Sequence, residues 1–143
     1  MKVLVALILL ISLSYAAPAT RLIKQTNLPA VYLILDGKKS WIPDPAAYNR
    51  IIVTSENKIT LIPDVDVYTT GPQIDTNSQL IRGKDANAIY LVSYGKKRWI
   101  TNPTVFNDLG FDWNKVVIVD HWVLQLFSSG PAINWLKSEK LHH

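Results

Sequence analysis

The chain has 143 residues, contains no cysteine and carries a formal net charge of +4 at pH 7. The absence of cysteine excludes disulfide bonds and thiolate metal sites, so the fold must be stabilised by burial of the 48% of residues that are hydrophobic. The positive charge is mild and spread along the chain, without the dense Lys/Arg stripe typical of nucleic-acid-binding proteins, and we therefore expect no nucleic-acid partner.

Residues 1–16 have the features of a secretory signal peptide. Lys2 precedes an apolar run over residues 3–13, and Ser14 and Ala16 are small residues at the positions that signal peptidase reads. The run is shorter than the about 20 residues that a membrane-spanning helix needs, although an uncleaved anchor is the alternative. We expect cleavage after Ala16 and a secreted, extracellular chain with no membrane span.

The rest of the sequence contains an internal repeat. Residues 22–50 align without a gap with residues 80–108 at a constant offset of 58, and 12 of the 29 aligned pairs are identical. Because a unit of about 55 residues without disulfides or metal is marginal for independent folding, the two copies are expected to share one compact domain. The predicted organisation is a signal peptide at residues 1–16, repeat 1 at residues 17–79, and repeat 2 with a C-terminal capping strand at residues 80–143.

Each repeat is predicted to open with a strand, at residues 22–24 or 80–82, and to continue with a β-hairpin. The Asp36-Gly37 pair lies between two short apolar runs and is a strong signal for a two-residue turn. Tyr94-Gly95 in the second copy is a weaker signal for the same turn. Such a turn places Tyr32 opposite Trp41. Alternation along the strands then predicts a core face and a second face. The expected core face carries Val31, Leu33, Leu35 and Ile42 in the first copy, and the other face carries Tyr32, Ile34, Lys39 and Trp41.

A short helix is predicted after each hairpin. Asp44-Pro45 and Asn102-Pro103 each combine an N-cap residue with a proline at the first helical position, and Gly110 is expected to end the second helix. Further strands are expected near residues 58–62 and 116–119, each followed by a short turn or helix. These elements predict an α+β fold built from two pseudo-symmetric β-hairpin–helix–strand repeats with short helices and one shared core. A third copy of the opening strand is expected at residues 135–137.

The second repeat carries the string Tyr90-Leu91-Val92, Gly95-Lys96-Lys97-Arg98-Trp99-Ile100, Pro103, Phe106 and Gly110-Phe111-Asp112-Trp113. This pattern resembles tandem repeats of about 55 residues in secreted and cell-surface proteins, mostly bacterial with some invertebrate examples. The first repeat departs from the pattern because it lacks the Gly-x-Asp-Trp segment. The resemblance implies an extracellular, non-enzymatic module, and a lectin-like role follows by analogy only.

Motifs for catalysis are scarce. His121 has no counterpart in the first repeat and is interpreted as an ordinary surface or partly buried imidazole. Asp64 and Asp66 are interpreted as a helix cap and a solvated acid, with a pair of calcium ligands as the alternative. We therefore expect no enzymatic activity, no metal site and no cofactor.

The duplicated aromatic residues are the candidate binding site. An exposed indole can stack on the apolar face of a sugar ring while nearby polar side chains orient the hydroxyl groups. The alternative is that each Tyr–Trp pair stabilises its hairpin and that its ring face packs under the helix. The predicted ligand-binding residues are Tyr32, Lys39, Trp41, Asp44, Tyr90, Lys97, Trp99 and Asn102.

These residues favour a secreted carbohydrate-binding, lectin-like module that is bivalent through its two repeats. The expected partner is a glycan or a cell-surface polysaccharide. The alternative is a structural or adhesive extracellular matrix protein that self-associates as a homo-oligomer, and a small secreted enzyme ranks last.

Overall fold

The computed structural model describes residues 20–134 of the chain. The expected signal peptide and the expected strand at residues 135–137 lie outside the described residues. Within the described part, none of the helices has both the length and the apolar character needed to cross a membrane.

The first half of the described chain forms a four-stranded sheet in the order β3-β2-β1-β4, in which β1 and β4 are parallel and the other neighbours are antiparallel. Its last strand covers only part of the segment predicted from sequence. The elements are β1 (Leu22–Gln25), β2 (Val31–Leu35), β3 (Lys38–Ile42), the helix α2 (Pro45–Ile51), β4 (Thr60–Ile62) and the 3-10 turn η1 (Val65–Val67).

The second half forms a five-stranded sheet in the order β8-β5-β6-β7-β9, in which β5 pairs with β8 in parallel. The two-residue strand β9 pairs with β7 and was not predicted from sequence. The elements are β5 (Gln79–Gly83), β6 (Ile89–Ser93), β7 (Lys96–Ile100), α3 (Pro103–Asp108), the 3-10 turn η2 (Trp113–Lys115), β8 (Val117–Val119), α4 (His121–Leu124) and β9 (Ser128–Ser129).

The hairpin registers predicted from sequence are confirmed. Tyr32 pairs with Trp41, and Tyr90 pairs with Trp99. Both turns have positive φ at their two central residues, with values of 55° and 71° at Asp36 and Gly37 and similar values in the second hairpin. This is the backbone geometry of the tight turns that match the natural twist of paired strands, so the two-residue loops fix which side chains share a face.

The predicted helix starts are also confirmed. The side chain of Asp44 accepts a hydrogen bond from the backbone N–H of Ala47 at 2.8 Å, and Asn102 accepts one from Val105 at 3.0 Å. Gly110 follows α3 with φ of 74°, the left-handed conformation that ends many helices. Both helices therefore begin where their capping residues place them, and Gly110 ends α3.

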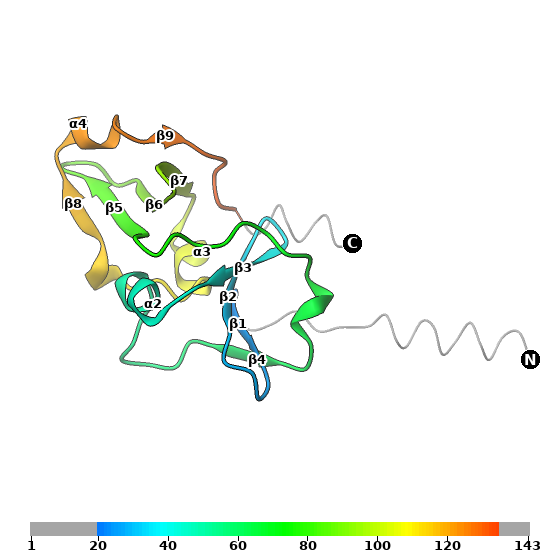
Figure 1. Cartoon of the computed structure of the whole chain (residues 1–143). Coiled ribbons are helices and arrows are strands. Elements are labelled where there is room, and N and C mark those ends of the chain that lie inside the picture. The colour runs from blue at the N-terminus through cyan, green and yellow to red at the C-terminus, as the bar shows by residue number, and fades with distance from the viewer. Residues whose placement is uncertain (1–19, 135–143) are drawn as a thin grey trace, which may run out of the picture.

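One hydrophobic core joins both sheets and the helices α2 and α3, which lie at the junction of the two sheets in Figure 1. The segments that follow these helices pair directly, through an antiparallel bridge between Ile52 and Phe111. The architecture is thus α+β, with two sheets and few short helices. The core residues include Leu22, Leu33, Leu35, Ile42, Ile51, Ile52, Leu80, Leu91, Ile100, Val105, Phe106, Leu109 and Phe111.

The opposite faces of the two hairpins are partly covered by the segments around η1 and α4. The segment around η1 packs on the first sheet, where Ile23, Ile34 and Val65 form a small second cluster. The segment around α4 packs on the second sheet, where Ile81, Val92 and Leu124 form a third. These two small clusters change the environment of several residues that were expected to contact a ligand.

Candidate functional site

The two duplicated lysines hold the covering segments in place. The Lys39 ammonium donates hydrogen bonds to the Val65 carbonyl, the Asp66 carboxylate at 2.6 Å and the Tyr68 carbonyl, and it lies 5.9 Å from the centre of the Tyr32 ring. All three of its N–H donors are therefore used inside the molecule. Lys39 is buried and has a structural role.

Lys97 makes the corresponding contacts in the second half. Its ammonium donates to the carbonyls of Leu124 and Phe127, each at 2.9 Å. These bonds fasten the α4 segment to β7. Both lysines lie on the predicted faces of their hairpins, and the segments around η1 and α4 accept their hydrogen bonds.

The two paired tryptophans remain open to solvent, with 42% of Trp41 and 46% of Trp99 exposed. Their partners Tyr32 and Tyr90 are half-buried and pack on the small clusters. The structure therefore separates each Tyr–Trp pair into a packing residue and an exposed residue, and the exposed indole is the part that a ligand can reach.

A hollow of about 400 Å³ lies at the end of the second hairpin. We name it the tryptophan hollow. It is formed where the ends of β6 and β7 meet the first turn of α3 and the η2 turn. Two of the predicted site residues, Trp99 and Asn102, line it together, and the full lining is Asn87, Ala88, Ile89, Trp99, Ile100, Thr101, Asn102, Pro103, Phe106 and Trp113.

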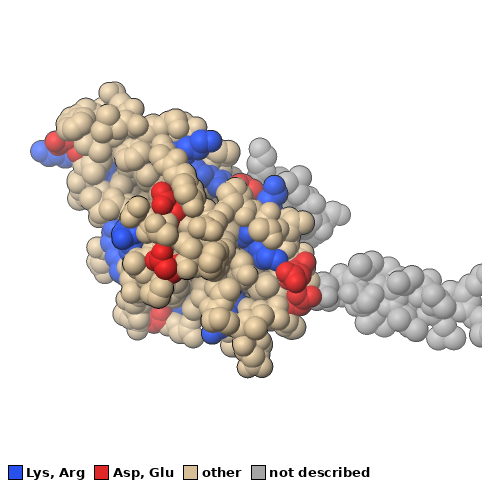
Figure 2. All heavy atoms as spheres, in the orientation of Figure 1, with Lys and Arg blue, Asp and Glu red and all other residues tan. Residues whose placement is uncertain are grey.

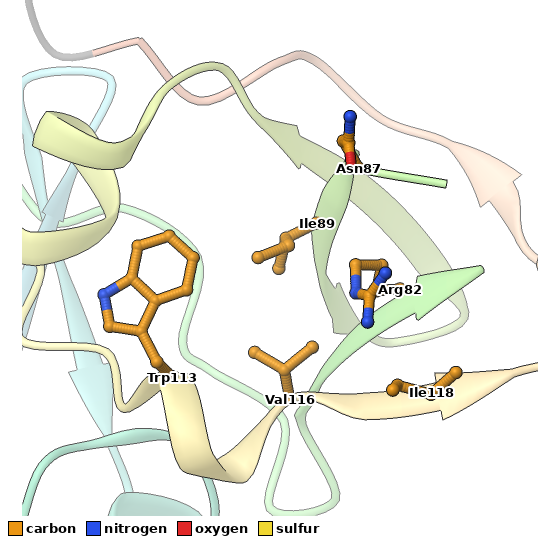
Figure 3. Close-up of a pocket in the computed structure, with 6 residues that line it drawn as sticks. All are labelled: Arg82, Asn87, Ile89, Trp113, Val116 and Ile118. Carbon is orange, nitrogen blue, oxygen red and sulfur yellow. The ribbon is translucent and has the colours of Figure 1, made fainter. Parts of the chain in front are cut away.

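A second hollow of about 340 Å³, the arginine hollow, adjoins the first. It lies over β5 and β8, and Figure 3 shows Ile89 between Trp113 on one side and Arg82 on the other. Asn87, Ile89 and Trp113 line both hollows. The remaining lining residues are Arg82, Val116 and Ile118.

Trp113 is the shared wall, and its neighbours hold it there. Its indole packs on the ring of Phe106, and its indole N–H donates to the side-chain oxygen of Asn107 at 2.9 Å. Asp112 begins the turn by accepting a hydrogen bond from the Asn114 N–H. Trp113 is nevertheless 48% exposed, so part of its surface faces solvent.

The sheet beneath the hollows places four side chains in one row. Arg82 pairs with Ile89 on one side and with Ile118 on the other, and Ile89 pairs in turn with Ile100. Directly paired residues share a face of the sheet. The row Ile100–Ile89–Arg82–Ile118 therefore forms a floor that is apolar except at Arg82.

The polar groups of the tryptophan hollow are two amides and a hydroxyl. The Asn102 oxygen caps α3, and in the described part of the chain its side-chain NH₂ has no hydrogen-bond partner. The same is true of the Asn87 amide. The Thr101 hydroxyl donates to the Ile133 carbonyl at 3.1 Å. These amides can hydrogen-bond a ligand without breaking an internal contact.

The lining of the two hollows carries little charge. Of their lining residues, as far as the chain is described, only Arg82 is charged. On the face shown in Figure 2, Lys and Arg are scattered among acidic residues and do not form a single basic patch. Residues 20–134 hold no group of three His, Asp or Glu side chains that could share a metal ion.

The groups with shifted pKa values lie outside the lining of both hollows. Burial raises the pKa of the Tyr48 and Tyr68 hydroxyls and of the Asp108 carboxyl, and burial lowers the pKa of the Arg21 guanidinium. Arg21 and Asp108 attract one another, which opposes both of their shifts. These shifts bear on stability and not on chemistry at the hollows.

The remaining predicted site residue, Asp44, caps α2 in the first half. The sequence marked Trp113 as a difference between the two copies and as part of the repeat pattern, but not as a ligand-binding residue. The signal that could have identified it is the Gly110-Phe111-Asp112-Trp113 segment, in which an aromatic residue follows a helix end and a turn-capping aspartate.

Comparison of the chain with models of protein families, with curated proteins and with solved structures found no match.

Proposed function

We propose that this protein is a secreted, non-catalytic carbohydrate-binding module built from two pseudo-symmetric repeats. The observation that carries the proposal is the tryptophan hollow, where the partly exposed indoles of Trp99 and Trp113 line one concavity with the side-chain amides of Asn87 and Asn102. Indole surfaces stack on sugar rings, and amides hydrogen-bond their hydroxyl groups.

The size and openness of the hollow favour weak binding of a short glycan segment. Small-molecule sites range over about 300–1,000 Å³, and the tryptophan hollow, at about 400 Å³, lies near the lower end. Sites of this kind gain strength when two of them engage one polymer, because the second binding event is then intramolecular. A polysaccharide or a glycan-covered cell surface is the partner that provides such repeated ligands.

Pseudo-symmetry would supply the second site. Its support is that the two hairpins have matching registers and that Trp41 is exposed to nearly the same extent as Trp99. The first repeat has no aromatic residue in the segment after α2, where the second repeat has Trp113. We therefore propose unequal sites, of which the Trp99 site binds more strongly than the Trp41 site.

The absence of catalysis is supported by the residues at the hollows. Hydrolysis of a glycosidic bond ordinarily needs two carboxyl groups that flank the bond. The lining of the two hollows, in the described residues, includes no Asp, Glu or His side chain. Binding without turnover is the function that such a lining favours.

A glycan-array screen of residues 17–143 tests the proposal, with a Trp41→Ala/Trp99→Ala variant beside the wild type. Trp122→Ala is the matched control, because Trp122 is 60% exposed but lines neither hollow. We expect the wild type and the control to bind one class of glycan and the folded double variant to lose it. No binding by the wild type at high concentration would contradict the proposal.

Self-association is the second candidate function, and one observation favours it. The edge strand β8 and the neighbouring α4 segment expose a series of large apolar side chains, Val117, Ile118, Trp122 and Leu126. Exposed apolar edge strands tend to pair with another chain. Sedimentation velocity over a range of concentrations tests this function, which requires a dimer or larger species that Ile118→Lys dissociates.

A further inference from the structure

We infer that the ligand is an acidic glycan, with the carboxylate of one sugar bound by Arg82 in the arginine hollow and a neighbouring sugar in the tryptophan hollow. This inference rests on the proposed function and names the substrate class of the same site.

The two hollows together fit consecutive units of one oligosaccharide. They share Asn87, Ile89 and Trp113, so a ligand can pass from one to the other along the same wall. The tryptophan hollow is bounded by two indoles, whereas the arginine hollow is bounded by one indole and a guanidinium (Figure 3). The first therefore suits an uncharged sugar ring, and the second suits a ring that carries an anionic group.

Arg82 has the capacity to bind a carboxylate. One of its terminal nitrogens donates to the Ala86 carbonyl at 2.8 Å, which fixes the guanidinium at the sheet surface. A guanidinium has five N–H donors, and in the described residues that of Arg82 makes no other hydrogen bond and no ion pair. The remaining donors can form the paired hydrogen bonds that match the two oxygens of a carboxylate.

The surroundings of Arg82 favour an anion over a cation or a neutral group. Its neighbours in the sheet row, Ile89 and Ile118, are apolar, and no acidic residue lines either hollow within the described chain. A carboxylate in the arginine hollow would lie beside one positively charged residue and no negatively charged one. Trp113 and Val116 would partly shield this carboxylate from water. Complementary charge of this kind adds specificity more than affinity.

The first half of the chain provides an internal comparison. Its row is Ile42–Val31–Lys24–Leu61, so Lys24 has the place that Arg82 has in the second sheet. Lysine is a point charge that lacks the paired donors of arginine, and no tryptophan corresponds to Trp113. Removing the charge of Lys24 lowers the net charge of the protein as much as removing that of Arg82, but leaves the arginine hollow intact.

The test is an array on which uronate- and sialate-containing oligosaccharides are each printed beside their own carboxyl-reduced, neutral counterparts. We expect the wild type to bind at least one acidic glycan about tenfold more tightly than its reduced form. Arg82→Gln is expected to lose that preference while it still binds the reduced form. Arg82→Lys should keep part of the preference, and Lys24→Gln should keep all of it.

The outcomes separate this inference from the proposed function. Equal binding of acidic and reduced glycans by the wild type, or an equal loss of preference in Lys24→Gln and Arg82→Gln, would overturn the role of Arg82 while carbohydrate binding stands. No binding to either form would overturn the proposed function and this inference together. A thermal melt of each variant verifies that Arg82→Gln, which loses the bond to Ala86, is still folded.

Discussion

The indole of Trp113 packs on the phenyl ring of Phe106, with ring centroids 4.0 Å apart and ring planes inclined by 32°. Phe106 is itself in the main core and is 1% exposed. The wall of the hollows is therefore anchored to the main core, so a ligand that stacks on Trp113 meets an indole that is already held in place.

Trp113→Ala removes this wall and is expected to weaken glycan binding at least tenfold, about 1.4 kcal/mol. The aromatic contact with Phe106 is also lost, at a cost of about 0.5–1.5 kcal/mol in the free energy of unfolding. Trp113→Phe keeps a stacking ring and should retain most of the glycan affinity and most of the free energy of unfolding. Isothermal titration calorimetry and urea unfolding of the two variants measure the two effects, and unchanged binding by Trp113→Ala would contradict the role of the wall.

Lys39→Met is expected to destabilise the fold and to spare glycan binding. The substitution leaves two backbone carbonyls without their charged donor. A hydrogen bond to a charged group contributes about 1.5–3 kcal/mol to the free energy of unfolding. We expect a loss near the lower end of that range, because Asp66 is largely exposed and regains solvation. Urea unfolding measures the loss. A stable Lys39→Met variant that no longer binds glycan would instead support the direct ligand contact expected from sequence.

Gly110→Ala should destabilise the protein more than Gly95→Ala. Both glycines have φ of +74°, which costs an L-residue about 1–2 kcal/mol. A Cβ at Gly110 would lie 3.0 Å from Leu22 in the core, whereas one at Gly95 would meet nothing within 4 Å. The difference between the two unfolding free energies isolates the steric contribution. Equal losses would contradict the packing of the Gly110 turn against β1.

Tyr48 is expected to make the fold sensitive to alkaline pH. Burial raises the pKa of its hydroxyl above the ordinary value of 10.0, so the folded state holds the proton more tightly than the unfolded chain does. This contribution to stability is complete below pH 10.0 and is lost as the pH rises through the folded-state pKa.

Tyr48→Phe should therefore flatten the fall of the unfolding free energy above about pH 10. Tyr94→Phe is the matched control, since Tyr94 is 61% exposed. Urea unfolding at a series of pH values measures both slopes. If Tyr48→Phe and the wild type lose stability in parallel, the burial of the Tyr48 hydroxyl does not contribute.

Much of the secondary structure in residues 20–134 could be predicted from short-range signals, but the two-residue strand β9 could not. The Asp36-Gly37 turn sets the register of its hairpin, and Asp44-Pro45 sets the start of α2, because each signal acts within a few residues. The partners of Lys39 could not be predicted in this way. They lie 26–29 residues further along the chain, and only the folding of η1 onto the sheet brings them close.

The candidate site was predictable in part for the same reason. Trp99 and Asn102 are three residues apart, so their proximity follows from the end of the hairpin. Arg82 and Trp113 are distant in sequence and line one hollow only because β8 pairs with β5. Parallel pairing across a long connection has no local signal, and the second hollow was therefore missed.

The most direct test of the central claim is an NMR titration of the tryptophan indole N–H signals with the glycan that binds most strongly on the array. We predict that the signals of Trp99 and Trp113 shift together with one dissociation constant, while the signal of Trp122 stays in place. Shifts at Trp122 without shifts at Trp99 and Trp113, or no saturable shift at all, would contradict the assignment of the glycan site to the tryptophan hollow.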